Sequence, residues 1–275
     1  MTGQYGTGRR LDEVRLALSA RDLAVLATLG RFRLATGQQM RRLHFSGHSG
    51  PEAAARAARR ALRRLADLGL VDHLQRRIGG VRAGSSGLVW HLSRTGWRML
   101  AQVEGCILPR RLDTAEPSLR TCDHRLAVTE VAVRLHEAAV ARVCDVIALD
   151  PEPSCWRTYL NAGGGVVTLK PDLFAVTAKP NAEFEDVWFI EVDRATESRA
   201  TILRKATQYE AYRRCGREQQ AQGVFPLVLW VTPDNKRAEA ILAAIRDDPG
   251  VDERVHRAVS IEGLAEFFGR PPPAG

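Results

Sequence analysis

Two apolar segments that end in acidic residues constrain the fold of this chain more than any other feature. They lie in the stretch TLKPDLFAVTAKPNAEFEDVWFIEVDRATES, residues 168–198, on either side of a polar turn. The β-branched and aromatic residues of both segments predict strands, and the turn between them predicts a hairpin. Asp172 begins the first segment, and Glu191 and Asp193 end the second. The chain therefore has to fold around a hairpin with three carboxylates at one end.

The strand periodicity predicts that these three carboxylates share a face. Residues two apart in a strand point to the same side, so Glu191 and Asp193 do so. If residue 178 lies opposite residue 187, then Asp172 lies opposite Asp193, and directly opposite residues share a face. We therefore expect the three acids to converge at one rim of the sheet.

Converging carboxylates indicate a cation. Like charges repel unless one group takes up a proton or a cation lies between them. Magnesium binds through one or two carboxylates together with phosphate and water oxygens, and such an ion activates water at a phosphodiester. We therefore expect Mg²⁺ or Mn²⁺. The alternative is that the acids lie in solvent at strand ends, paired with Arg194 or Arg204, since surface ion pairs are common.

The surrounding sequence predicts an α/β module over residues 120–270. A helix precedes the hairpin, and a helix, an almost wholly apolar strand (VFPLVLWVT) and another helix follow it. This alternation is typical of a sheet covered by helices.

The first 110 residues differ from this module in charge. They hold 19 arginines against seven acidic residues, a net charge of +12, whereas the remainder carries −4. This asymmetry predicts two modules, with nucleic acid as the partner of the first. A basic surface that is merely solvated is the alternative.

Residues 20–105 predict a winged helix-turn-helix. Two helices, the second capped by Thr36, precede the helix PEAAARAARRALRRLAD, and a hairpin with a Gly- and Ser-rich loop follows. The first helix is expected to end at Gly30. In the third helix Ala55, Ala58, Leu62 and Leu65 form an apolar stripe. In this fold the third helix enters the major groove of double-stranded DNA and the wing contacts the backbone. The expected DNA-binding residues are Arg56, Arg59, Arg60 and Arg63 on the helix and Arg76, Arg77 and Arg82 on the wing. A helix with a solvated arginine face, or a winged helix that binds protein, is the alternative.

The PD at positions 171–172, followed by Glu191 in a strand, resembles the motif of the PD-(D/E)XK nucleases. That resemblance implies a restriction-endonuclease-like fold with Asp172 and Glu191 as catalytic metal ligands and Asp193 beside them. Asp193 stands where the family has lysine, which is a departure. Some members place this lysine on the next helix, which implies Lys205 as the catalytic lysine. Glu130, Gln208 and Tyr209 would support the site.

The whole layout resembles the replication-relaxation family of mobile genetic elements. The stretches HRLAVTEVAVRL, PDLFAV, FIEVDRATES, KATQYEAY and FPLVLWVT carry this resemblance, over residues 20–265. It implies a plasmid, conjugative-element or phage protein that acts in DNA replication or relaxation. Together with the nuclease resemblance, it implies a DNA-binding protein with a metal-dependent endonuclease or nickase domain. The alternative is a non-catalytic DNA-binding regulator or replication accessory protein, whose degenerate nuclease fold forms a homodimer or docks a partner.

Other sequence features exclude several classes. No run of about 18 apolar residues predicts a membrane span, and no signal peptide is evident. Five scattered cysteines fit reduced thiols in the cytoplasm. The glycine-rich turn NAGGGVV lacks the lysine of a phosphate-binding loop, so no nucleotide cofactor is expected. The expected boundaries are a tail over 1–19, the winged helix over 20–105, a linker over 106–119, the nuclease-like domain over 120–270 and a tail over 271–275.

Overall fold

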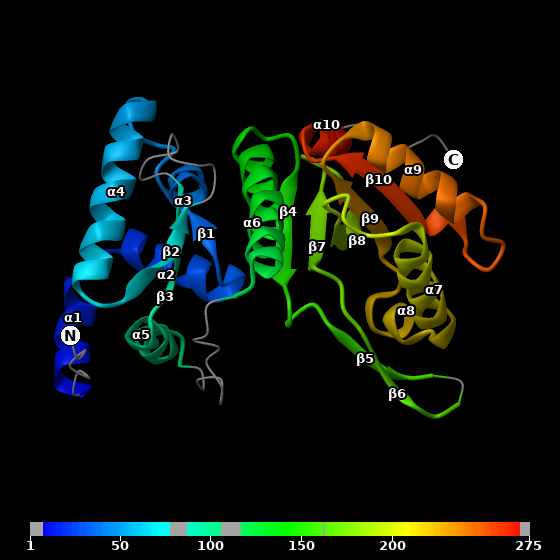
Figure 1. Cartoon of the computed structure of the whole chain (residues 1–275), viewed down its shortest axis with the longest axis horizontal. Helices are drawn as coiled ribbons and strands as arrows, with labels where there is room; N and C mark the ends of the chain where they lie inside the picture. The colour runs from blue at the N-terminus through cyan, green and yellow to red at the C-terminus, as the bar shows by residue number, and fades with distance from the viewer. Residues whose placement is uncertain (1–7, 78–86, 106–116, 162, 270–275) are drawn as a thin grey trace. The chain divides into compact units, whose positions relative to one another are not determined.

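The computed structural model describes residues 8–77, 87–105, 117–161 and 163–269, apart from the side chains of residues 8–10 and 75–77. The chain divides into two compact units, residues 1–129 and 130–275, and each has a buried hydrophobic cluster of its own. Helices and strands mix in both units, which confirms the predicted α/β class (Figure 1).

The first unit contains the predicted order of three helices followed by two paired strands, together with an earlier helix and a short strand that were not predicted. A helix, a short strand, two helices and two longer strands follow one another, and the strands form an antiparallel sheet in the order β1-β3-β2. The elements are α1 (Gly8–Ala17), α2 (Ala20–Phe32), β1 (Ala35–Thr36), α3 (Gly37–His44), α4 (Pro51–Asp67), β2 (Val71–Arg77), β3 (Leu88–Leu92) and α5 (Arg94–Glu104).

Reciprocal side-chain caps fix where two of these helices begin. The Thr36 hydroxyl accepts a hydrogen bond from the Gln39 backbone N–H, and the Gln39 side chain accepts one from the Thr36 backbone, which confirms the predicted cap of α3. Ser19 and Asp22 form the same arrangement at α2. Such caps satisfy backbone donors that the first helical turn leaves without partners.

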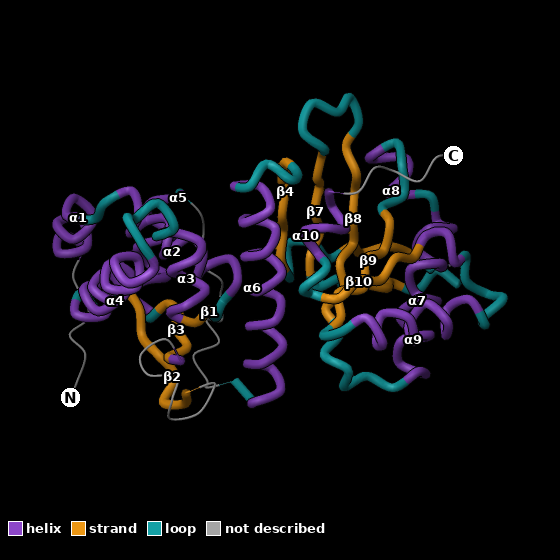
Figure 2. The backbone as a smooth tube through the Cα atoms, turned by 90° about the horizontal axis from the view of Figure 1, so that it is seen from above, coloured by secondary structure: helices purple, strands orange, loops and turns teal. Residues whose placement is uncertain are grey.

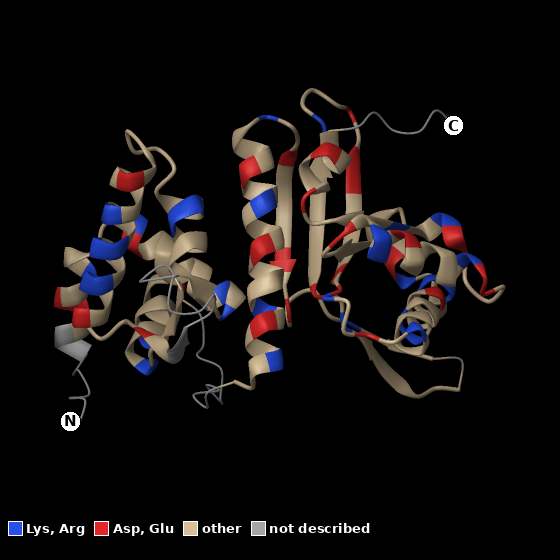
Figure 3. Cartoon of the chain, turned by 45° about the horizontal axis from the view of Figure 1, so that its top comes forward, with Lys and Arg blue, Asp and Glu red and all other residues tan. Residues whose placement is uncertain are grey.

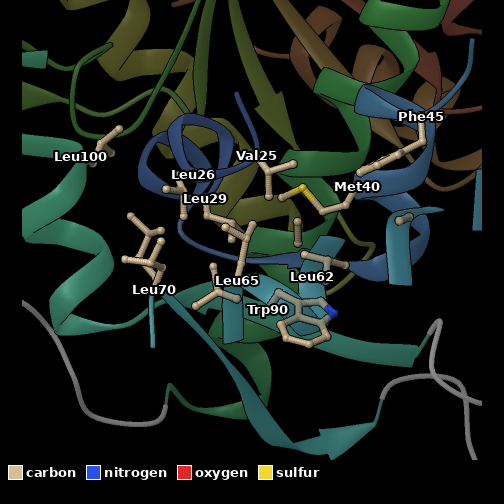
Figure 4. Close-up of a cluster of buried hydrophobic side chains, with 14 of the residues drawn as sticks. Val25, Leu26, Leu29, Met40, Phe45, Leu62, Leu65, Leu70, Trp90 and Leu100 are labelled. Carbon is tan, nitrogen blue, oxygen red and sulfur yellow. The ribbon is translucent and has the colours of Figure 1, made fainter. Parts of the chain in front are cut away.

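The packed face of α4 organises the core of this unit. Ala54, Ala58, Leu62 and Leu65 are buried, so the apolar stripe is the predicted one except that Ala54 replaces the half-buried Ala55. Figure 4 shows part of the hydrophobic cluster that this face joins, to which α2, α3, α4, α5 and β3 all contribute. The residues labelled in the figure are Val25, Leu26, Leu29, Met40, Phe45, Leu62, Leu65, Leu70, Trp90 and Leu100.

Two predictions for this unit are wrong. The expected tail over residues 1–19 contains helix α1, because Leu11, Val14 and Leu18 pack against the core. The first predicted helix, which is α2, does not end at Gly30 but continues to Phe32. Gly30 allows the close approach of α5 instead, since a Cβ there would overlap the Leu100 Cδ2 atom.

Helix α6 (Leu119–Val140) contains the division between the two units, which falls after Thr129. The prediction placed this helix wholly in the second module. Its first half instead packs in the first unit, where Cys122 and Leu126 form a cluster with Leu34, and the Thr129 hydroxyl donates to the Leu34 carbonyl at 2.8 Å. No helix among the described residues is long and apolar enough to span a bilayer.

The second unit is built on a five-stranded sheet in the order β10-β9-β8-β7-β4, drawn in orange in Figure 2. Strand β7 pairs antiparallel with both β4 and β8, whereas β8 with β9 and β9 with β10 pair in parallel. The elements after α6 are β4 (Asp145–Pro151), β5 (Arg157–Leu160), β6 (Val166–Leu169), β7 (Leu173–Ala178), β8 (Glu185–Val192), α7 (Arg199–Cys215), α8 (Arg217–Gln222), β9 (Leu227–Thr232), α9 (Asn235–Arg246), η2 (Glu253–Val255), β10 (His256–Ser260) and α10 (Leu264–Gly269).

Helices α7 and α9 cover one face of this sheet (Figures 1 and 2). Phe189 and Trp230 on that face share a buried cluster with Tyr209 of α7 and Ile241 of α9. On the other face, Trp188 packs edge-on against Phe268 of α10. The order of α6, the hairpin of β7 and β8, α7, β9 and α9 is the helix, hairpin, helix, strand and helix order predicted from the sequence. Strands β5 and β6 form a separate hairpin, inserted between β4 and β7.

The predicted pairing of β7 with β8 is wrong by two residues. Ala178 lies opposite Glu185, not opposite Val187, and Leu173 lies opposite Ile190. A shift of two residues leaves every side chain on its predicted face, because side chains alternate with a period of two. Asp172 consequently comes opposite Glu191.

Candidate functional site

Asp172 and Glu191 lie next to an aromatic pair on the face of the sheet that α7 covers. Phe174 and Phe189 are opposite one another, with ring centroids 5.8 Å apart. Asp172 and Glu191 are each two positions away from one of these rings along the chain, so they share this face. The Asp172 N–H donates to the Ile190 carbonyl at 3.1 Å, which continues the ladder to the acid itself. The Asp172 side chain is fixed as well, because its Oδ2 atom accepts the Val192 N–H at 2.7 Å.

Both oxygens of Glu191 accept hydrogen bonds from α7. Lys205 Nζ lies 2.9 Å from Oε2, and Tyr209 Oη lies 2.6 Å from Oε1. Lys205 and Tyr209 are four residues apart and therefore neighbours on one side of the helix. Helix α7 begins just after Ser198, whose hydroxyl caps the Thr201 N–H. The sequence implied Lys205 and Tyr209 for this site, and the structure places both against Glu191.

Burial and charge perturb this group of side chains. Glu191 is 3% exposed, and burial followed by the negative charge of Asp172 raises its pKa to about 7, although Lys205 and Tyr209 act in the opposite direction. Burial lowers the pKa of Lys205, but Glu191, Glu197 and Asp172 together raise it above its ordinary value. The Lys205 ammonium group is therefore surrounded by several carboxylates, and the pKa values of both Lys205 and Glu191 are shifted. Shifted pKa values of this kind are common at functional sites.

Asp193 does not join the other two acids. Its carboxylate forms a two-point ion pair with Arg237 of α9, in which Arg237 Nε and Nη2 lie 2.6 Å and 3.1 Å from Oδ2 and Oδ1. Within the described part of the chain, no group of three or more His, Cys, Asp or Glu side chains is placed to hold a metal ion. The expected convergence of Asp172, Glu191 and Asp193 is therefore absent, because a guanidinium matches the Asp193 carboxylate in shape and charge.

The remaining pair nevertheless fits a divalent cation. Asp172 and Glu191 are both buried, and the charge of Asp172 raises the pKa of Glu191, so a cation between them would relieve their repulsion. Two carboxylates are a sufficient protein contribution for Mg²⁺, which keeps several water or phosphate ligands. Asp172 and Glu191 are the residues that would hold such an ion.

The other two predicted supporting residues have surroundings of a different kind. Glu130 accepts a hydrogen bond from Arg134 at 3.2 Å, and Arg134 also binds Glu262 at 2.7 Å. Gln208 is exposed on α7. The side-chain support of Glu191 thus comes from Lys205 and Tyr209.

The predicted arginines of α4 form an exposed basic surface, the blue segments along this helix in Figure 3. Arg56 lies 3.6 Å from Glu52, whereas Arg64 is tied to the buried Asp22 of α2. The residues of this surface are Arg56, Arg59, Arg60 and Arg63. Of the predicted wing residues, Arg76 and Arg77 lie in β2 without described side chains, and Arg82 lies outside the described residues.

Two residues of the second unit contact the predicted site residues although neither was itself predicted for the site. Arg237 and Glu197 both contact predicted site residues: Arg237 binds Asp193, and Glu197 Oε1 lies 2.9 Å from Lys205 Nζ. Arg237 is 44 positions from its partner, and only the packing of α9 on the sheet brings them together.

A comparison with models of protein families confirms the predicted family. A family model described as replication-relaxation matches residues 26–228, about three quarters of the chain. The chain belongs to the replication-relaxation family. No curated protein matches this family member in sequence. Among solved structures it is similar to the restriction endonuclease FokI bound to DNA, with 10% identity and a TM-score of 0.28, over 98% of this chain and 72% of that chain. A similarity this low supports no inference about fold or function.

Proposed function

We propose that this replication-relaxation protein binds double-stranded DNA and cleaves a phosphodiester bond in it with the help of Mg²⁺ or Mn²⁺. The observation that carries the proposal is the group formed by Asp172, Glu191 and Lys205 on the face of a helix-covered sheet. Two acids and a lysine are the residue types that the resemblance to PD-(D/E)XK nucleases implied. Here the two acids come from the hairpin of β7 and β8, and the lysine comes from helix α7.

Each residue of the group has a role that follows from its surroundings. Asp172 and Glu191 would hold the divalent ion, and a bound ion would supply an activated water and neutralise charge on the phosphate. Lys205 keeps its positive charge beside Glu191, and its side chain is 25% exposed. It would stabilise the negative charge that develops on the phosphate. Tyr209, which is buried, would hold the Glu191 carboxylate in place.

The arginines on α4 would bind the DNA. They lie on the helix that directly precedes two paired strands, they are exposed, and they belong to the half of the sequence that carries the excess positive charge. Guanidinium groups pair with phosphates and with guanine edges, so a row of them suits a duplex. A role in the replication or relaxation of a plasmid, conjugative element or phage follows from the family alone.

Plasmid cleavage tests this proposal. Supercoiled plasmid is incubated with the protein in Mg²⁺, in Mn²⁺ or in chelator, and the nicked and linear products are quantified. We expect metal-dependent cleavage that Asp172→Asn, Glu191→Gln and Lys205→Met each abolish. Glu185→Gln, which changes an exposed acid on the same strand β8, should leave cleavage unchanged. Intact plasmid under all metal conditions would refute the nuclease activity.

One observation favours a second candidate, a DNA-binding protein without nuclease activity. Both oxygens of Glu191 already have donors, and Asp193 stands at the usual lysine position in an ion pair with Arg237. In that case the same incubations would leave the plasmid intact and retard it in a gel, and the retardation would weaken steeply as salt is raised.

A further inference from the structure

A continuous series of polar contacts runs from the end of β8 to Lys205. It begins at Asp193, passes through Arg237 of α9 to the loop at residues 194–198, and reaches Lys205 of α7 through the Glu197 side chain. All of these residues belong to the second unit. The series links three elements around the candidate site.

The first part of the series holds the loop in an unusual conformation. Asp193 is buried, and its Oδ2 atom accepts the Ala195 N–H at 3.0 Å as well as the Arg237 Nε donor. Ala195 has a φ of 56°, in the left-handed region that residues with a Cβ rarely adopt. The Asp193 carboxylate thus stabilises a turn that the local sequence would not favour.

The second part fixes Glu197. Arg237 Nη2 donates to the Glu197 carbonyl at 2.7 Å, and Arg237 itself is anchored because its N–H donates to the Asp234 cap of α9 at 2.8 Å. The Glu197 side chain then reaches Lys205, with Oε1 2.9 Å from Nζ. Its other oxygen is buried and has no hydrogen-bond partner among the described residues. Lys205 is therefore the contact that orients this carboxylate.

Lys205 is shared equally between two acids. Its Nζ atom lies 2.9 Å from Glu191 Oε2 and 2.9 Å from Glu197 Oε1. An ammonium group has three donors, so these two contacts fix its direction and leave one donor for another group. Without Glu197 the partly exposed lysine would pair with Glu191 alone or turn to solvent.

We propose that Glu197 is a positioning residue for Lys205, and that the ion pair of Asp193 with Arg237 holds Glu197 in place. The acid at position 193 then has a function of its own: it anchors the loop that positions a lysine supplied from α7. The effect on cleavage rests on the proposed nuclease function, but the positioning of Lys205 does not.

Lysine acylation tests the positioning directly, because the chain has only four lysines, Lys170, Lys179, Lys205 and Lys236. The full chain is treated with limiting acetic anhydride, and the rate at each lysine is measured by mass spectrometry. In the wild-type protein we expect Lys205 to react far more slowly than the exposed Lys236. Glu197→Gln and Arg237→Gln should each raise the rate at Lys205 severalfold relative to Lys236. Glu239→Gln, which changes an exposed acid on α9, is the matched control.

Two outcomes would overturn the inference. One is an unchanged Lys205 rate in Glu197→Gln, which keeps the side-chain size but removes the negative charge that pairs with the ammonium group. The other is an equal rise at Lys205 in the control Glu239→Gln, which would mean that the rate at Lys205 does not depend on Glu197. Thermal unfolding shows whether each variant is folded, and Glu197→Gln decides the question if Arg237→Gln does not fold.

Cleavage kinetics supply the second readout. If the wild-type protein nicks plasmid, Glu197→Gln should lower kcat by about tenfold to a hundredfold and leave KM unchanged, as expected when a catalytic group is misplaced. A rise in KM alone would contradict the positioning role. If the wild-type protein does not nick plasmid, the nuclease proposal fails, and the acylation rates still decide whether Glu197 positions Lys205.

Discussion

Glu191 is the acid at the candidate site whose surroundings most strongly affect its charge. It is buried next to a second acid, and it accepts hydrogen bonds from one lysine and one tyrosine on α7. Burial and the charge of Asp172 raise its pKa to about 7, so close to neutral pH the carboxyl group exchanges between protonated and ionised forms. A divalent cation would favour the ionised form, because metal ions bind carboxylates only after deprotonation.

Metal affinity should therefore depend on pH through Glu191. Because the pKa without metal is about 7, binding below that pH must displace a proton, and affinity should fall by up to about tenfold per pH unit. Above this pKa the affinity should level off. Calorimetric titration with Mn²⁺ on both sides of neutral pH measures this, together with the number of protons released. A constant affinity with no proton release across that range would contradict the assignment of Glu191 as a ligand.

At the scale of elements, the crossing of α5 over the start of β2 leaves no room for a side chain. A Cβ at Gly96 would overlap the Leu70 carbonyl oxygen, a backbone atom that cannot rotate away. Gly96→Ala should therefore destabilise the first unit by about 3 kcal/mol, the upper end for overpacking. Gly47→Ala, where a Cβ would meet nothing within 4 Å, is the control. Urea unfolding measures both, and equal stability of the two variants would show that the crossing can accommodate a methyl group.

Helix α4 should govern the salt dependence of DNA binding. Arg59, Arg60 and Arg63 are exposed along it. Each Arg→Ala change should weaken binding to all duplex sequences and lower the slope of log affinity against log salt by about 1 for each phosphate that the variant no longer neutralises. Fluorescence anisotropy at several salt concentrations measures the slope. Arg246→Ala, which changes an exposed arginine of α9 paired with Glu253, should leave it unchanged, and equal slopes in all four variants would exclude α4 as the DNA-binding helix.

The hairpin of β7 and β8 illustrates what the sequence can and cannot specify about a site. Alternation of side chains predicted the face of Asp172 and Glu191 correctly, and an error of two residues in register did not affect it, because the period is two. The partners of Asp193 and Lys205 were not predictable in the same way. Arg237 reaches Asp193 through the packing of α9. Glu197 lies in the stretch FIEVDRATES, but its contact with Lys205 depends on the turn at Ala195, so no local pattern predicted either contact.

At the scale of the whole molecule, the sequence predicted two modules from charge but misplaced the division between them. The apolar residues of α6 predicted a helix, but they did not indicate which turns of it would pack in the first unit and which in the second. The structure divides that helix, with Leu126 buried beside Leu34 in the first unit. Likewise α1 lies in the segment predicted as a tail, because its few apolar residues produce only a weak periodicity.

Stability at acid pH should differ between the two units because of His256. This residue of β10 is buried and accepts a hydrogen bond from Trp230 Nε1 at 3.2 Å, and burial lowers its pKa to about 4. The unfolded chain binds this proton more readily, so stability that is present above about pH 6.5 is lost as pH falls toward 4, by about 3 kcal/mol over the whole window.

The His256→Gln variant should remove this part of the pH dependence. Denaturant unfolding of the second unit, followed by tryptophan fluorescence from neutral to mildly acidic pH, compares the variant with the wild-type protein. The stability difference between them should shrink as pH falls. A constant difference would mean that His256 takes up its proton without cost in the folded protein.

The central claim is that Asp172 and Glu191 form a divalent-ion site beside Lys205. Anomalous diffraction from crystals grown with Mn²⁺ tests it most directly, because the signal locates the ion without any assay of activity. We predict a manganese peak bound to both carboxylates in the wild-type protein, and no peak there in Asp172→Asn. Crystals that show manganese elsewhere or nowhere, with Glu191 still paired to Lys205 and Tyr209, would contradict the claim.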